Sequence, residues 1–274
     1  MPGDLRGLRP KKRLGQHFLI DAAATQRIAS TVLDERFDPT IPVLEIGAGT
    51  GELTRALVAG GANLTAIEID PQLVEFLRAR DDLGSAAIVR ADATTFDYAG
   101  FSAGKPWRAV GNLPYYIGTA LVVMLAEMSG GPDVLVAMIQ KDVADRLAAA
   151  PGSPSYGSLS VAVQYATHVE RIFTLGSGAF YPRPKVDSTV VRLVRREVPA
   201  VSVADEGIFK QVVRAAFAYR RKTLANSLML ALALPRNAVA AAIAACNLEP
   251  EIRGEQLDLA AFARLADALA QERI

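Results

Sequence analysis

The stretch Val43-Leu44-Glu45-Ile46-Gly47-Ala48-Gly49-Thr50-Gly51 decides the fold of this 274-residue chain. Its apolar first half predicts a buried strand, and the pattern of residues 52–59 predicts a helix directly after the glycines. Glycines at such a turn let the backbone bend tightly and approach a ligand with no Cβ in the way. The turn therefore predicts a ligand site, but alone it also fits a dinucleotide fold or a plain tight turn.

Short apolar runs and helical patterns continue to alternate after this turn. A helix is predicted over residues 71–80, where Pro71 suits the first turn. Strands alternating with helices indicate βαβ units and a parallel, doubly wound, Rossmann-like α/β sheet, with ligands at the carboxyl ends of its strands. The further predicted strands cover residues 63–69, 86–90, 107–111 and 134–139.

The pattern changes in the last 120 residues. Residues 159–165 and 188–194 are rich in β-formers and are predicted to pair as antiparallel strands at one sheet edge. After residue 199 the strand signals cease, and apolar residues recur at helical spacing over 209–217 and, behind the cap-like Asp258, over 259–269. We therefore expect a catalytic domain over residues 1–199 and a small helical domain over residues 200–274.

Composition restricts the class of protein. The chain is 51% hydrophobic and 22% charged, as globular proteins are, and its single cysteine and two histidines leave no disulfide or Cys/His zinc site. We see no signal peptide or membrane span, and expect a cytoplasmic monomer without metal. The net charge of +1 leaves the partner open, although basic residues cluster locally at Arg6, Arg9, Lys11, Lys12 and Arg13, and at Arg220, Arg221 and Lys222.

The ends of three predicted strands indicate the cofactor. The turn reads G-x-G-x-G, whereas a dinucleotide site prefers G-x-G-x-x-G. Glu68 ends the second strand, where its carboxylate can accept from both ribose hydroxyls, in an adenosyl group as well as in NAD. Asp92 at the end of the third strand can accept from an adenine amino group. Gly47, Glu68 and Asp92 in this order are typical of class I methyltransferases and favour S-adenosylmethionine over NAD.

The most specific motif is Asn112-Leu113-Pro114-Tyr115 at the end of the fourth strand. It resembles the N-[LP]-P-[YF] element of adenine and cytosine amino-methyltransferases. The lone pair of an exocyclic amine is delocalised into the ring, so the nitrogen must be held tetrahedral by acceptors before it reacts. The Asn112 side-chain oxygen and the Leu113 carbonyl can act as these acceptors, because Pro114 fixes the backbone that directs them. The ring of Tyr115 would then stack on the base, which has to leave its helix or loop to reach the site.

Nearly the whole chain resembles the KsgA/Dim1 family of ribosomal RNA adenine dimethyltransferases. Beyond the motifs above, the resemblance lies in four segments. They are Lys12-Arg13-Leu14-Gly15-Gln16-His17-Phe18-Leu19-Ile20-Asp21, Phe180-Tyr181-Pro182-Arg183-Pro184-Lys185-Val186-Asp187-Ser188, Ala218-Tyr219-Arg220-Arg221-Lys222-Thr223-Leu224 and Arg253-Gly254-Glu255-Gln256-Leu257.

The resemblance implies N6,N6-dimethylation of two adjacent adenosines near the 3′ end of 16S rRNA in the small ribosomal subunit. It places Asn112, Leu113, Pro114 and Tyr115 at the methyl acceptor, with Phe180 stacking on the flipped adenine opposite Tyr115. Phosphate contacts are implied for Arg220, Arg221 and Lys222 in an rRNA-recognition domain. The residues implied to contact the cofactor are His17, Leu19, Gly47, Glu68, Asp92 and Asn112.

Three positions depart from the family pattern. His17 and Tyr116 stand where Asn is common, and Ala48 replaces a usual Pro. The first bears on the wall of the cofactor pocket, the second on the entry of the target strand, and the third on the stiffness of the turn.

Several alternatives remain at this point. An Erm-like enzyme acting on 23S rRNA would share the first domain, and a non-catalytic ribosome-assembly factor could retain the fold. A DNA adenine methyltransferase is disfavoured, since about 75 residues after the boundary leave little room for reading bases in the major groove.

Overall fold

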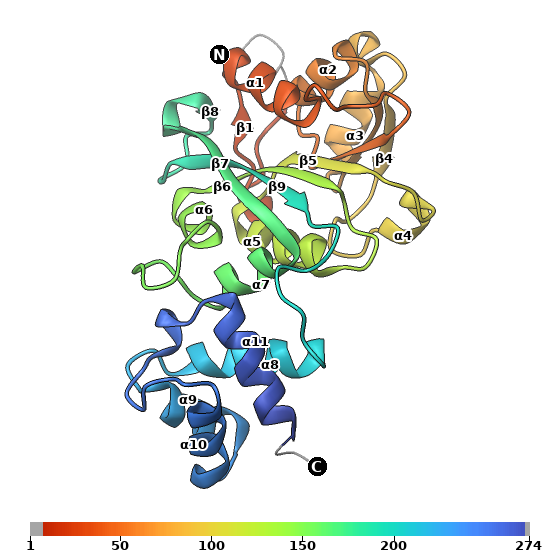
Figure 1. Cartoon of the computed structure of the whole chain (residues 1–274). Coiled ribbons are helices and arrows are strands. Elements are labelled where there is room, and N and C mark those ends of the chain that lie inside the picture. The colour runs from red at the N-terminus through yellow and green to blue at the C-terminus, as the bar shows by residue number, and fades with distance from the viewer. Residues whose placement is uncertain (1–7, 272–274) are drawn as a thin grey trace. The chain divides into compact units, whose positions relative to one another are not determined.

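The computed structural model of the chain describes residues 8–271, so Arg6 of the N-terminal basic cluster lies outside the described residues. The chain divides into two compact units, 1–144 with 169–195, and 145–168 with 196–274 (Figure 1). This division differs from the predicted one at residues 145–168, which join the second unit. The later crossing, between residues 195 and 196, lies close to the predicted boundary at 200.

The first unit contains a seven-stranded sheet in the order β4-β3-β2-β5-β6-β9-β7. Its first five strands in this order are parallel, which confirms the predicted α/β architecture, and β9 pairs antiparallel with β6. The strands of this sheet are β2 (Pro42–Ile46), β3 (Asn63–Glu68), β4 (Ala87–Arg90), β5 (Arg108–Asn112), β6 (Val134–Gln140), β7 (Thr167–Leu175) and β9 (Ser188–Arg195).

Helices cover both faces of this sheet. Val136 and Met138 of β6 belong to an apolar cluster shared with α1 and α2. Ile139, which points to the opposite face, lies beside Gly118 of α5. The helices of this unit are α1 (Ala22–Val32), α2 (Glu52–Ala59), α3 (Pro71–Arg78), α4 (Tyr98–Ser102) and α5 (Tyr115–Glu127), and α6 (Lys141–Leu147) crosses from one unit to the other.

A second, two-stranded sheet joins segments that are far apart in sequence. β1 (Phe18–Leu19) pairs antiparallel with β8 (Phe180–Tyr181), so that Phe18 faces Tyr181 and Leu19 faces Phe180. Two of the segments that carry the family resemblance are therefore held together by backbone hydrogen bonds. Residues 11–19, from the N-cap of the 3₁₀ turn Lys12–Leu14 to the end of β1, are called the N-terminal strap below.

The second unit is helical around one apolar core that includes Phe209 and Phe262. The predicted helices correspond to α8 and α11, and Asp258 accepts a hydrogen bond from the Ala261 amide, as its cap-like position predicts. The helices of this unit are α7 (Ser158–Ala166), α8 (Glu206–Ala218), α9 (Leu224–Leu232), α10 (Arg236–Ala245) and α11 (Leu259–Gln271).

The predicted strand over residues 159–165 is wrong, because this segment forms α7. Its apolar residues alternate as in a strand, but α7 is buried on several sides. The hydrophobic pattern of such a segment does not distinguish a helix from a strand. The buried Ser160 is satisfied by donating to the Arg146 carbonyl. The edge strand beyond β9 is β7, whose central Glu170 and Arg171 interrupt an apolar pattern.

No helix among residues 8–271 is both long enough and apolar enough to span a bilayer.

Candidate active site

One cavity of the first unit lies at the carboxyl ends of β2, β3, β4 and β5. This is where a parallel sheet with crossover helices leaves room for a ligand. The cavity brings together all the predicted cofactor residues and, except for Phe180, the predicted methyl-acceptor residues. Those that line it are His17, Leu19, Gly47, Glu68, Asp92, Asn112, Leu113, Pro114 and Tyr115.

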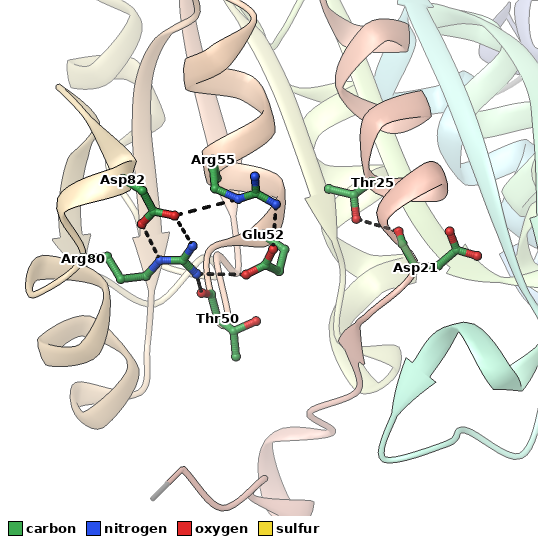
Figure 2. A network of polar contacts seen from close by, with 7 residues as sticks. All are labelled: Asp21, Thr25, Thr50, Glu52, Arg55, Arg80 and Asp82. Atoms are coloured by element: carbon green, nitrogen blue, oxygen red, sulfur yellow. Dashed lines mark hydrogen bonds and ion pairs between the residues drawn. The ribbon is translucent and has the colours of Figure 1, made fainter. Parts of the chain in front are cut away.

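The glycine turn forms the floor of the cavity. Gly47, Gly49 and Gly51 all have positive φ, between 58° and 85°, which side-chain-bearing residues rarely adopt. The turn is held from outside by Arg80, whose Nη1 donates to the Thr50 carbonyl at 2.6 Å and to Glu52 at 3.0 Å, while Nη2 binds Asp82 (Figure 2). Arg80 therefore fixes the backbone that a ligand would contact.

Two carboxylates stand at the neighbouring strand ends. Glu68 accepts hydrogen bonds from the Asp70 and Gly49 amides, and burial, which outweighs these bonds, raises the pKa of Glu68. Asp92 accepts from the amide and hydroxyl of Thr94 through Oδ1 alone, and these bonds lower its pKa. The other Asp92 oxygen is left to accept from a ligand amino group.

A third carboxylate in the cavity is one that sequence reasoning missed. Glu45 of β2 is only 1% exposed, and its Oε2 has no hydrogen-bond partner. Burial raises the pKa of Glu45 to about 8, with the charge of Glu68 adding to the shift and Thr54 opposing it. The available signal was the acidic residue inside an otherwise apolar strand, immediately before the glycines.

The N-terminal strap is fastened to the end of β3 by a buried carboxylate. Asp70 binds Lys11 at 2.6 Å and Gln16 at 3.2 Å, and its side chain also caps α3. Burial of Asp70 opposes its ionisation, but the hydrogen bonds from Lys11 and Gln16 outweigh that cost and lower the pKa of Asp70. This ion pair was not foreseen, since its partners are 59 residues apart in sequence.

Asn112 is oriented by the strap. Its Nδ2 donates to the His17 carbonyl at 2.8 Å, which leaves Oδ1 as the free acceptor of the amide. The Leu113 carbonyl also accepts no hydrogen bond from residues 8–271. Two unpaired acceptors from consecutive residues therefore border one cavity, as the chemistry of an exocyclic amine requires.

The two predicted base-stacking residues, Tyr115 and Phe180, differ in their access to the cavity. The Tyr115 hydroxyl hydrogen-bonds Ser188 at 2.7 Å, and its ring stacks on His17 with centroids 5.5 Å apart. The His17 Nδ1 lies 2.7 Å from the Pro182 carbonyl. Phe180 does not line the cavity, because its ring is 1% exposed and packs in the core beside β1. Stacking of Phe180 on a base would require its side chain to move out.

The basic triplet lies in the second unit, on the turn between α8 and α9. Arg220, Arg221 and Lys222 are all exposed. Arg220 donates to the Pro154 carbonyl and lies 3.9 Å from Glu255, so it is partly neutralised. Arg221 and Lys222 have no such partner among residues 8–271.

Comparison with known proteins identifies the family. The ribosomal RNA adenine dimethylase family matches residues 7–271. This chain belongs to that family. It is 42% identical to the ribosomal RNA small subunit methyltransferase A of Pseudomonas aeruginosa, over 96% of each chain. It is also 42% identical to the protein of that name from Streptococcus gordonii, over 96% of this chain and 92% of that one.

Solved structures agree with this membership. The chain is similar to the 23S rRNA methyltransferase ErmE, with a TM-score of 0.70 and 29% identity, over 93% of this chain and 100% of that one. The fold also matches a dimethyladenosine transferase from Plasmodium falciparum, with a TM-score of 0.76 and 22% identity, over 94% and 99% of the two chains. Family membership confirms the predicted class of enzyme, an rRNA adenine dimethyltransferase, and with it S-adenosylmethionine as the methyl donor.

Proposed function

We propose that this enzyme dimethylates N6 of two adjacent adenosines near the 3′ end of 16S rRNA, in the small ribosomal subunit of the cytoplasm. The relatives at 42% identity are named for the small subunit and match over nearly their whole length. The observation that carries the chemical part is the pairing of Asn112 with the His17 carbonyl, which leaves the Asn112 Oδ1 and the Leu113 carbonyl as free acceptors.

The cavity has the donor and acceptor groups that S-adenosylmethionine needs. Glu68 and Asp92 are acceptors for the ribose hydroxyls and the adenine amine, and the positive-φ glycines allow close approach of the chain. The unpartnered Glu45 oxygen is a buried acceptor that suits the cationic end of the cofactor. His17 and Leu19 of the strap, Gly47 of the turn and Asn112 complete the set. When bound, the cofactor supplies an electrophilic methyl group on a sulfonium.

The chain itself positions the acceptor nitrogen. The Asn112 Oδ1 and the Leu113 carbonyl accept the two hydrogens of the adenine amine, which directs the nitrogen lone pair toward the cofactor side of the cavity. Both acceptors are fixed before the substrate arrives, so little reorganisation is required in the transition state. Pro114 holds the turn between these acceptors and Tyr115, whose ring packs against the base. Phe180 is the second ring and stacks on the base after its buried side chain moves out of the core.

The second unit supplies contacts to the RNA backbone. Arg221 and Lys222, with a smaller contribution from the partly paired Arg220, contact phosphates. Such contacts position the RNA but carry no sequence information, so the choice of adenosines depends on the shape of the RNA around them.

The test is to incubate the protein with S-adenosylmethionine labelled in its methyl group and ribosomal subunits that lack the modification, and then to map the label. The expected result is label in N6,N6-dimethyladenosine at neighbouring positions of 16S rRNA. Label in 23S rRNA would support the Erm-like alternative, to which the similarity with the 23S rRNA methyltransferase ErmE also points. Tight binding to particles without any label would support a non-catalytic assembly factor.

A further inference from the structure

Tyr116 is an aromatic side chain at the cavity that the proposed chemistry does not use. It follows Tyr115 in the first turn of α5 and lines the same cavity as Asn112. It is 58% exposed, more than any other large hydrophobic side chain along the cavity. Within residues 8–271 it makes no hydrogen bond and no ring–ring contact, so its exposure is not explained by a structural role.

The ring lies next to Gly15, which lines the same cavity. The position that a Cβ of residue 15 would take is 3.4 Å from Cδ1 and 3.8 Å from Cε1 of Tyr116, so the absence of a side chain at Gly15 leaves space beside the ring. Gly15 has a φ of +58° and belongs to the strap, which Asp70 fastens through Lys11 and Gln16. Tyr116 is thus an exposed ring beside a backbone segment that Asp70 holds in place.

The segment that contains Gly15 also carries free cations. Lys12 and Arg13, in the 3₁₀ turn that ends at Gly15, are exposed and form no ion pair among residues 8–271, whereas Lys11 is paired with Asp70. Proteins bind single-stranded nucleic acid by combining exposed aromatic rings, on which bases stack, with cations that meet the phosphates, and here the cations belong to the segment next to the ring.

We propose that Tyr116 stacks on the base of a nucleotide next to the target adenosine, while Lys12 and Arg13 contact the adjoining phosphates. This inference rests on the proposed function. A target base that leaves its helix loses stacking on both sides, and its neighbour loses stacking on the side that faced the target. Tyr116 replaces that loss for the neighbour, at the mouth of the cavity that receives the target. In an RNA with two adjacent adenosines, the neighbour is the other methyl acceptor.

The experiment measures methyl transfer to unmodified small subunits by the wild type, Tyr116→Ala and Tyr116→Phe. Stacking contributes about 1–3 kcal/mol per base, so Tyr116→Ala should raise KM for the particle about 5- to 150-fold, with kcat nearly unchanged. Tyr116→Phe should behave as the wild type, because it keeps the ring. Binding of S-adenosylhomocysteine and the melting temperature should be equal in all three. Val198→Ala, at an exposed apolar residue outside the cavity lining, is the matched control.

A second readout reports stacking directly. Short single-stranded RNAs carry 2-aminopurine on one or the other side of an adenosine. The wild type and Tyr116→Phe should quench its fluorescence on one side, and Tyr116→Ala should not. Unchanged KM in Tyr116→Ala, or equal fluorescence with all three proteins, would overturn the role of Tyr116. Failure of the wild type to methylate adenine in any rRNA would instead overturn the proposed function.

Discussion

Replacing Glu45 by Gln should stabilise the ligand-free protein, by an amount that grows with pH. Glu45 is buried, and its pKa is raised from an ordinary value of 4.5 to about 8. Below pH 4.5 the carboxyl is protonated in both the folded and the unfolded chain. Between pH 4.5 and 8 the unfolded chain releases the proton while the folded chain retains it, so stability falls as pH rises, and it levels off above 8.

The size of the effect follows from the shift. From pH 4.5 to 7 the unfolded state gains about 1.4 kcal/mol per pH unit relative to the folded state, or about 3 kcal/mol in all. Gln cannot ionise, so this loss disappears in the variant. The difference in stability between variant and wild type should therefore approach about 3 kcal/mol at pH 7 and be small at pH 5.

The assay is chemical denaturation of both proteins at pH 5, 6, 7 and 8 without ligand. Glu75→Gln, at an exposed carboxyl on α3, is the control and should follow the wild type throughout. Because Glu45 lines the cofactor cavity, the stabilised variant should also bind S-adenosylhomocysteine about three- to tenfold more weakly, as loss of one hydrogen bond implies. Parallel pH profiles for Glu45→Gln and the wild type would refute the reasoning.

Two further predictions concern the glycine turn and the basic triplet. Arg80→Ala releases the Thr50 carbonyl and should weaken S-adenosylhomocysteine binding about fivefold in calorimetry. Arg55→Ala, at an exposed residue of the same network, is the control and should leave the affinity unchanged. Equal affinities for both variants would show that the hydrogen bond from Arg80 to Thr50 is dispensable. Combined replacement of Arg220, Arg221 and Lys222 by Ala should weaken RNA binding and flatten its salt dependence by about one unit of slope for each phosphate that is no longer neutralised. Most of that change should come from Arg221 and Lys222, because Arg220 is partly paired with Glu255, and an unchanged slope would place the RNA elsewhere.

The sequence predicted the parallel sheet well because each strand there is short, apolar and followed by a turn or a helix. Gly47, Glu68, Asp92 and Asn112 were located together for the same reason, since parallel strands bring their carboxyl ends to one edge. Residues 159–165 were assigned wrongly because burial on several sides gave a helix the alternation of a strand.

Other features depend on long-range packing that no local pattern records. The pairing of β1 with β8 joins segments some 160 residues apart, and the ion pair of Asp70 with Lys11 joins residues 59 apart. The burial of Phe180 follows from this pairing, and the sequence showed only an aromatic at the root of a loop. The unpaired state of the Glu45 oxygen is likewise a product of packing, although the residue itself was visible before the glycines.

The most direct test of the chemistry is single-turnover methyl transfer by Asn112→Ala, beside its affinity for S-adenosylhomocysteine. Because the lost acceptor acts mainly in the transition state, transfer should fall by at least about a hundredfold while the affinity stays within about tenfold of the wild type. Transfer to adenine at a near-normal rate would show that the amine is not held by Asn112.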